Sequence, residues 1–448
     1  MHEQFQSQLD ALDSAINATQ GPKKSNSGVS RGAKVTQNAV QSDPFSQLLR
    51  NLQRFANFQL KYIDCVDSYH SRSDINWAYS YTLQQATRDF DVISRAVDQR
   101  AKPYYSTRLQ VADAVCEELL RPAQDAGLCS SGVRVITYFN KISLARVVPY
   151  ANVAFIGIPW TSFANDRDLL ALPHELGHFI FWDERFQNDN SMPLYCRNAT
   201  YSNLPLHLKV KQFEDGGAHQ YRDTFEGWIE EMCADIIGCI LVRHYISQSF
   251  VELSLNHSDT ELTEDDGEHP PPFIRPDIYV QVLKRLDGSS TSGLTQTLSK
   301  EWKKRIDARL PHPNDQDERK GILAELMPKI NVLYDLYLKG VKSVGKVNIN
   351  SEDPNHKSIA NLDDLYVSWS NWVDEVNMQS PKNQTPPEPY YNDFATPQDW
   401  NKWQDNLFKL YTGIKETNPG CDTDNLNKTL QITVFAGGWT EGPCCGPR

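Results

Sequence analysis

The sequence predicts an α+β protein that is predominantly helical and contains one small mixed sheet. Apolar residues recur at helical spacing through most of the 448 positions. Only a central stretch alternates apolar and polar residues or is rich in β-branched and aromatic side chains, as strands are. Hydrophobic residues make up 40% of the chain, which at this length suffices for a sizeable core.

Two N-terminal segments precede the central stretch. Residues 1–42 are expected to be flexible, because after a short helical pattern they are rich in Gly, Ser, Asn, Lys and Gln. Residues 43–129 are expected to be helical, with Leu48 and Leu52 on one apolar face and Val115 on a later one. Neither segment carries a motif that points to a function.

Residues 130–285 are expected to form the core that carries the function. Two strands are predicted, at Val133–Phe139 and within Val147–Trp160. A helix follows, and we expect it to start close to Pro173, because an interior proline would remove a hydrogen bond and bend it. A second helix covers Phe225–Ile240, where apolar residues again recur at helical spacing.

The C-terminal region, residues 286–448, is expected to be mostly helical and to end in a tail rich in Gly, Pro and Cys. The predicted elements are helices within residues 302–310, 322–341, 359–376 and 400–414, and a strand at residues 430–438.

Composition and charge exclude several classes of function. A net charge of −12 and a pI near 5.4 argue against a protein that binds the phosphate backbone of nucleic acids. No apolar stretch is long enough to predict a membrane span. The N-terminus lacks a signal-peptide pattern, and nine cysteines without a regular framework indicate mostly reduced thiols. A soluble, cytoplasmic protein is therefore expected.

The strongest chemical signal is the segment 174–178, which reads HELGH. Residues four apart lie on the same face of a helix, so His174 and His178 can hold one metal ion. Glu175 lies one step round the helix, where it can act as general base on a water at that metal. The simpler interpretation is a pair of histidines with ordinary structural partners.

A catalytic zinc usually takes three protein ligands and keeps one position for water, so a third ligand is needed. The metzincin extension does not supply it, because Phe181 and Glu184 occupy the positions of its glycine and third histidine. His207 and His219 lie in an irregular connection, where no helix or strand obviously fixes them.

The second predicted helix offers a better third ligand. Glu231 and Asp235 are four residues apart, so their carboxylates point the same way. Glu231 can bind the metal while Asp235 accepts the second ring N–H of a ligand histidine. Glu230 is the competing ligand, but it has no carboxylate one turn further on. The alternative is a helix whose acidic residues simply face water.

These motifs together resemble the gluzincin metallopeptidases. HELGH followed about fifty residues later by Glu-x-x-Ala-Asp is most similar to the family of the CAAX prenyl proteases and their soluble relatives. That family's further signature, His-Pro-Pro with an Arg six residues after the His, matches His269 and Arg275. The resemblance covers about residues 130–285. It departs from the membrane members in lacking transmembrane helices, and Pro173 is not part of the usual pattern.

The resemblance implies two further elements of a peptidase site. His269 or Arg275 would lie over the zinc and help to hold the oxyanion of the tetrahedral intermediate. An edge strand just before the motif helix would pair with the substrate backbone by β-addition. The segment that fits this strand contains Asn152, Val153 and Ala154.

The function predicted is that of a zinc metallopeptidase with one Zn²⁺, acting on a peptide or protein substrate. Glu175 would take the proton of the metal-activated water and deliver it to the leaving amine. Two alternatives stay open: a zinc-stabilised binding or sensor protein that cleaves nothing, and a zinc hydrolase of a non-peptide amide.

The terminal regions suggest regulation, either by a partner protein or by the chain itself. A thiolate is a strong zinc ligand, so Cys444 or Cys445 could occupy the open position and hold the enzyme inactive. An ordinary exposed tail is the simpler interpretation of the same residues.

Overall fold

The structure is a computed structural model of the 448-residue chain. It describes residues 72–125, 129, 133–148, 151, 153–183, 222–255, 258–264, 269–287, 293–310, 313–342, 362–379 and 440–441, together with positions 7, 11, 14, 45, 47–54, 56 and 57. The predicted helix at residues 400–414 and the predicted strand at 430–438 lie outside this part, as do Asn152, His207 and His219.

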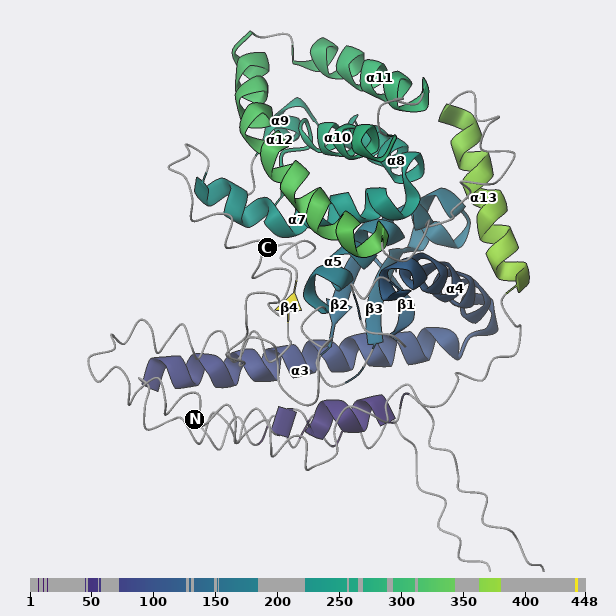
Figure 1. The fold of residues 1–448 in the computed structure, drawn as a ribbon. Coiled ribbons are helices and arrows are strands. Elements are labelled where there is room, and N and C mark those ends of the chain that lie inside the picture. The colour runs from purple at the N-terminus through teal and green to yellow at the C-terminus, as the bar shows by residue number, and fades with distance from the viewer. Residues whose placement is uncertain are drawn as a thin grey trace, which may run out of the picture.

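A small mixed sheet lies at the centre of the described part (Figure 1). Its strands are β1 (Arg134–Asn140), β2 (Leu144–Val147), β3 (Val153–Pro159) and β4 (Thr440–Glu441), in the spatial order β1-β3-β2-β4. β3 pairs in parallel with β1, whereas β2 is antiparallel to both β3 and β4. Two separate parts of the chain therefore contribute strands to this sheet, residues 134–159 and residues 440–441.

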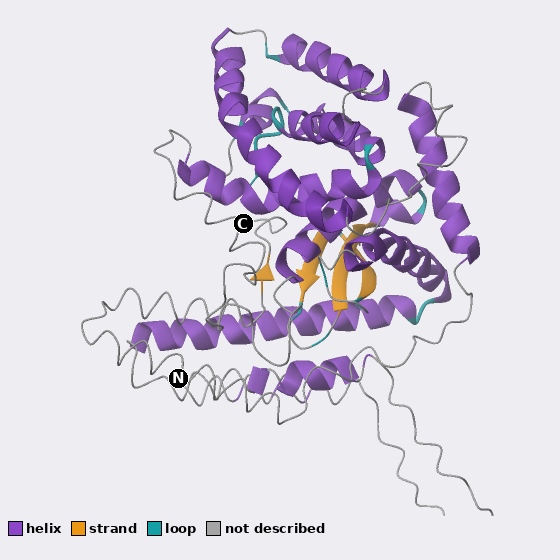
Figure 2. Cartoon of the chain, in the orientation of Figure 1, coloured by secondary structure: helices purple, strands orange, loops and turns teal. Residues whose placement is uncertain are grey.

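Both faces of the sheet are covered by helices. Side chains alternate along a strand, so Ile136 and Tyr138 of β1 face the core under α3 (Arg72–Arg100), whereas Val135 and Phe139 face the main core. On that second face α4 (Pro103–Asp125) packs against β1, and α5 (Leu172–Asp183) packs against β2 and β3. The result is a layered arrangement, with α3 and the helical segment within residues 45–57 on one side of the strands and the other labelled helices on the opposite side (Figures 1 and 2).

The predicted start of the motif helix is confirmed, since α5 begins at Leu172 and Pro173 lies in its first turn. Proline is tolerated there because the first N–H groups of a helix have no partner within it. Two short 3-10 turns, η2 (Trp160–Phe163) and η3 (Asp166–Ala171), connect β3 to this helix.

The predicted second helix is also confirmed, as α7 (Arg222–Val242), which packs along α5. The two helices approach closely at Gly177, where an added Cβ would lie only 2.6 Å from Cα of Ala234. Only a residue without a side chain permits this approach.

The rest of the described chain is helical. α10 (Arg275–Asp287) packs against α7, and one hydrophobic core continues from Leu109 to Val376. The remaining helices are α8 (His244–Leu255), α9 (Asp259–Thr263), α11 (Gly293–Arg309), α12 (Pro313–Lys342) and α13 (Leu362–Gln379). No described helix combines the length and apolar character needed to cross a bilayer.

The predominantly helical fold with a small mixed sheet is thus as predicted, but one strand assignment is wrong. The segment at Val153 and Ala154 was expected at a sheet edge, and it forms β3, which pairs on both sides. β2 was not predicted as a separate strand. Its Arg146 is buried against Asp89 and Gln85 of α3, and a buried arginine breaks the alternation by which a strand is recognised.

Replacing Gly177 by Ala is expected to lower the free energy of unfolding by about 1–3 kcal/mol, because the new methyl group meets the backbone of Ala234. Gly321→Ala in α12 is the control: nothing lies within 4 Å of its added Cβ, so stability should rise by about 1 kcal/mol. Urea denaturation of both variants measures the difference. Equal changes in the free energy of unfolding would show that the packing of α5 against α7 does not depend on this close approach.

Candidate metal centre

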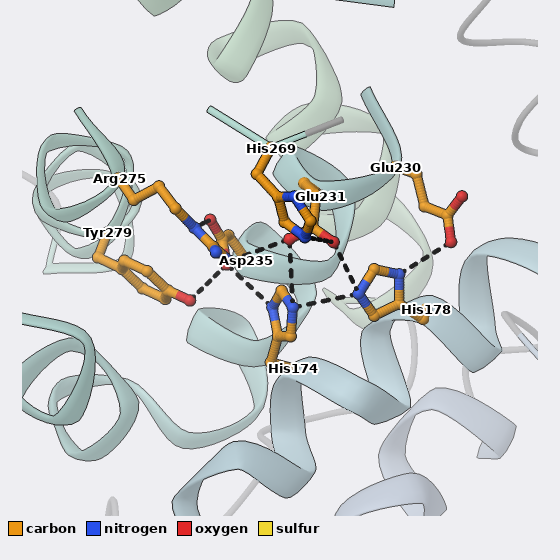
Figure 3. Close-up of polar contacts among 8 residues, drawn as sticks. All are labelled: His174, His178, Glu230, Glu231, Asp235, His269, Arg275 and Tyr279. Atoms are coloured by element: carbon orange, nitrogen blue, oxygen red, sulfur yellow. Dashed lines mark hydrogen bonds and ion pairs between the residues drawn. The ribbon is translucent and has the colours of Figure 1, made fainter. Parts of the chain in front are cut away.

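Three buried side chains from α5 and α7 converge on one point (Figure 3). The Nε2 atoms of His174 and His178 are 3.1 Å apart. The Glu231 carboxylate lies 3.4 Å from Nε2 of His174 and 3.2 Å from Nε2 of His178. All three ligand atoms fall within 4.8 Å of one another, so these residues could hold a metal ion.

Each histidine is oriented by a carboxylate on α7. Oδ1 of Asp235 lies 2.9 Å from Nδ1 of His174, and Oε1 of Glu230 lies 2.9 Å from Nδ1 of His178. A carboxylate next to Nδ1 favours a proton on that nitrogen and leaves the Nε2 lone pair for a metal. Asp235 therefore lies where the sequence predicted it. Glu230, considered there as a competing ligand, lies on the opposite side of the His178 ring from Glu231.

When the proton of each neutral imidazole is on Nδ1, the three side chains of the centre present only acceptors to one another. Two Nε2 lone pairs face each other at 3.1 Å, and neither oxygen of Glu231 accepts a hydrogen bond. Glu231 is only 1% exposed, so bulk solvent does not supply partners for its oxygens. A cation between the three side chains would satisfy all of them, and imidazole and carboxylate are suitable donors for Zn²⁺.

A second cluster on α10 holds the α7 carboxylates in place. Arg275 donates from Nε and Nη2 to Asp235 at 3.0 and 2.7 Å, and its Nη2 lies 3.1 Å from Oε2 of Glu231. The hydroxyl of Tyr279, one turn along α10, donates to Oδ1 of Asp235 at 2.5 Å. The Arg275 guanidinium also lies 4.7 Å over the ring of Phe250. Tyr279 was missed from the sequence, where only its i,i+4 spacing from Arg275 could have pointed to it.

His269 and Arg275 have different surroundings. The sequence alone could not decide which of the two would stabilise the oxyanion. Arg275 is occupied by two carboxylates, as described above. His269 is 26% exposed in its side chain, and its Nε2 lies 3.6 Å from Oε1 of Glu231. His269 therefore faces the ligand cluster from its more open side, whereas Arg275 buttresses the carboxylates.

The charges shift the pKa values of the acidic residues in opposite directions. Burial alone would raise the pKa of Glu231, but when no metal is bound, His178 and His174 in their protonated form, together with Arg275, outweigh it and hold that pKa well below its ordinary value. Burial dominates at Glu175, whose pKa is raised above the ordinary range of a glutamate. Glu175 is 3% exposed, and its Oε2 has no hydrogen-bond partner.

The residues predicted to bind substrate are not placed as expected. Val153 and Ala154 are buried in β3 and pair with β1, and Ala154 pairs with β2 as well. Ala154 therefore offers no free strand edge to a peptide, and Val153 lies in the same inner strand.

Comparison of this chain with models of protein families, with curated proteins and with solved structures gave no match. The assignment of function therefore depends on the geometry of the centre and on the motifs in the sequence.

Wild-type protein loaded with Zn²⁺ and dialysed should retain one ion per chain, and Glu231→Ala should lose it, because two imidazoles alone bind weakly. Glu230→Gln should retain the metal site but lower its affinity for Zn²⁺ by about 10–100-fold, because the side chain next to Nδ1 of His178 loses its charge. Elemental analysis and competition with a chelator measure both effects. Glu301→Ala, on the surface of α11, is the control. Unchanged affinity in both site variants would place the metal elsewhere.

Arg275→Met should cost about 3–5 kcal/mol of stability, because it leaves two buried carboxylates without their cation. Arg305→Met is the matched control: its pair with Glu301 is exposed, and its removal should cost about 0–1 kcal/mol. Denaturation in the presence of a chelator separates this effect from metal binding. A cost for Arg275→Met as small as that of the control would mean that Arg275 does not neutralise the cluster.

Proposed function

We propose that this protein is a zinc-dependent metallopeptidase of the gluzincin type, which hydrolyses peptide bonds. The observation that carries the proposal is the convergence of His174, His178 and Glu231 on one buried point, with Glu175 next to the first histidine on the same helix. A purely structural metal site has no need of an acidic side chain at position 175. The order of the motifs along the chain supports the same conclusion.

The donor set and its surroundings fit a zinc ion. Two neutral imidazoles and one carboxylate leave a fourth position open, as catalytic zinc sites do. A zinc ion bound there would polarise the scissile carbonyl and lower the pKa of a bound water. Glu230 and Asp235 would fix the two imidazoles, so that little reorganisation is needed when substrate binds.

Glu175 is the proposed general base. Its burial raises its pKa above the ordinary value of a glutamate, and a general base of raised pKa accepts a proton more readily. It would accept a proton from the attacking water and deliver it to the departing amine. Removing the carboxylate while keeping its shape should therefore abolish turnover and spare metal binding.

His269 is the proposed donor to the developing oxyanion. Its side chain is partly exposed and lies beside Glu231, and it is more open to solvent than His174, His178 and Glu231. Arg275 is instead assigned to positioning, because its guanidinium is held by Asp235 and Glu231. The proposal therefore gives His269 and Arg275 different roles, which the family signature alone does not distinguish.

Glu175→Gln should lose about 10²–10⁴-fold in peptide cleavage and retain its zinc, because the amide cannot accept the proton. The measurement is mass spectrometry of new termini in a library of peptides, with metal content determined on the same samples. Glu301→Gln on α11 is the matched control. Full cleavage activity in Glu175→Gln would overturn the role of Glu175, and absence of cleavage by the wild type would favour the non-catalytic alternative.

A further inference from the structure

One outer edge of the sheet is closed by side chains. On β1, the Phe139 N–H donates to Oε1 of Gln99 at 2.7 Å, and Nε2 of Gln99 donates back to the Phe139 carbonyl at 2.9 Å. This glutamine from α3 occupies the two backbone groups that an added strand would use.

The backbone N–H and carbonyl of Thr137, two residues earlier in β1, are also hydrogen-bonded by side chains. The Thr137 N–H donates to Oδ1 of Asp113 at 2.7 Å, and Nη1 of Arg100 donates to the Thr137 carbonyl at 2.5 Å. Arg100 and Asp113 are themselves paired at 2.6 Å. A peptide therefore cannot extend the described sheet on the β1 side.

The opposite edge belongs to β2, and it carries a strand from the far end of the chain. Thr440 and Glu441 of β4 pair antiparallel with Val147 and Arg146 of β2 (Figure 2). β2 packs directly against α5, the helix that carries the two ligand histidines. This is the edge that peptide binding by β-addition requires, on the strand next to the helix of the metal centre.

We propose that strand β4 is an internal ligand that competes with an extended peptide substrate for the outer edge of β2, the kind of edge at which the family resemblance would place such a substrate. The inference rests on the proposed function and names the substrate as an extended polypeptide, bound antiparallel to β2. β-addition uses main-chain hydrogen bonds, so the same edge accepts the chain's own segment and segments of different sequence.

Tethering makes so short a strand an effective competitor. Two paired residues bind weakly as a separate peptide, but attachment to the same chain gives the segment an effective concentration on the order of millimolar. The segment is displaced when a substrate provides a longer paired stretch or further contacts. The chain is thus inhibited reversibly, without cleavage of the segment.

The double variant Thr440→Pro/Glu441→Pro tests the inference in the full chain. Proline lacks the N–H that a strand donates, so β4 should leave the edge of β2. We expect kcat/KM for a peptide substrate to rise by about five-fold or more, the lower end of usual coupling between sites. The same double change at Asn427 and Lys428, outside β4, is the control. A chain ending at Gly438 removes the segment by an independent route and should show the same rise.

Peptide binding provides a readout that does not depend on activity. A labelled peptide of residues 434–443 should bind the proline variant carrying Glu175→Gln more tightly than it binds Glu175→Gln alone, as measured by fluorescence anisotropy. Binding without any peptidase activity supports the docking edge and overturns the proposed function. If neither the proline substitutions nor the truncation raises peptidase activity, and peptide binding does not differ, the docking inference is overturned. The proposed peptidase function would be unaffected by that result.

Discussion

The close approach of α5 and α7 at Gly177 is the constraint on which the candidate metal centre depends. A side chain at this position would push the two helices apart, because the nearest atoms belong to the backbone of Ala234. His174 and His178 flank Gly177 on one helix, and Glu231 and Asp235 flank Ala234 on the other. The contact therefore brings the histidines and the carboxylates within bonding distance of one another. Gly238 marks a second tight approach, since a Cβ added there would lie 3.2 Å from the backbone nitrogen of His174.

This packing concentrates negative charge in the protein interior. α7 contributes three carboxylates, of which Glu230 and Asp235 each orient a histidine, whereas Glu231 points at the shared centre. Arg275 neutralises part of this charge, and its ion pairs with Glu231 and Asp235 are buried. Such an arrangement is costly without a further cation, which is the physical basis for expecting a metal at this point. For the peptidase proposed above, the same preorganisation would favour catalysis, because the charged groups would already be in place when a substrate binds.

The sequence predicted those parts of the centre that depend on local geometry. The spacings within HELGH and from Glu231 to Asp235 are each one helical turn, so they could be recognised before any fold was known. What depends on contacts between distant elements could not be recognised in this way. The pairing of Glu230 with His178, the role of Arg275 as a buttress and the hydroxyl of Tyr279 on Asp235 all require the packing of α5, α7 and α10. Strand β2 was missed for a similar reason, since Arg146 in β2 is buried only because α3 supplies Asp89.

The most direct test of the central claim is X-ray absorption spectroscopy of the zinc-loaded protein. The account predicts a shell of nitrogen and oxygen ligands at about 2.0–2.1 Å from the ion, with the multiple scattering typical of two imidazoles. A sulfur shell at about 2.3 Å, or a spectrum without imidazole scattering, would contradict it, because the ion would then be held by residues other than His174, His178 and Glu231.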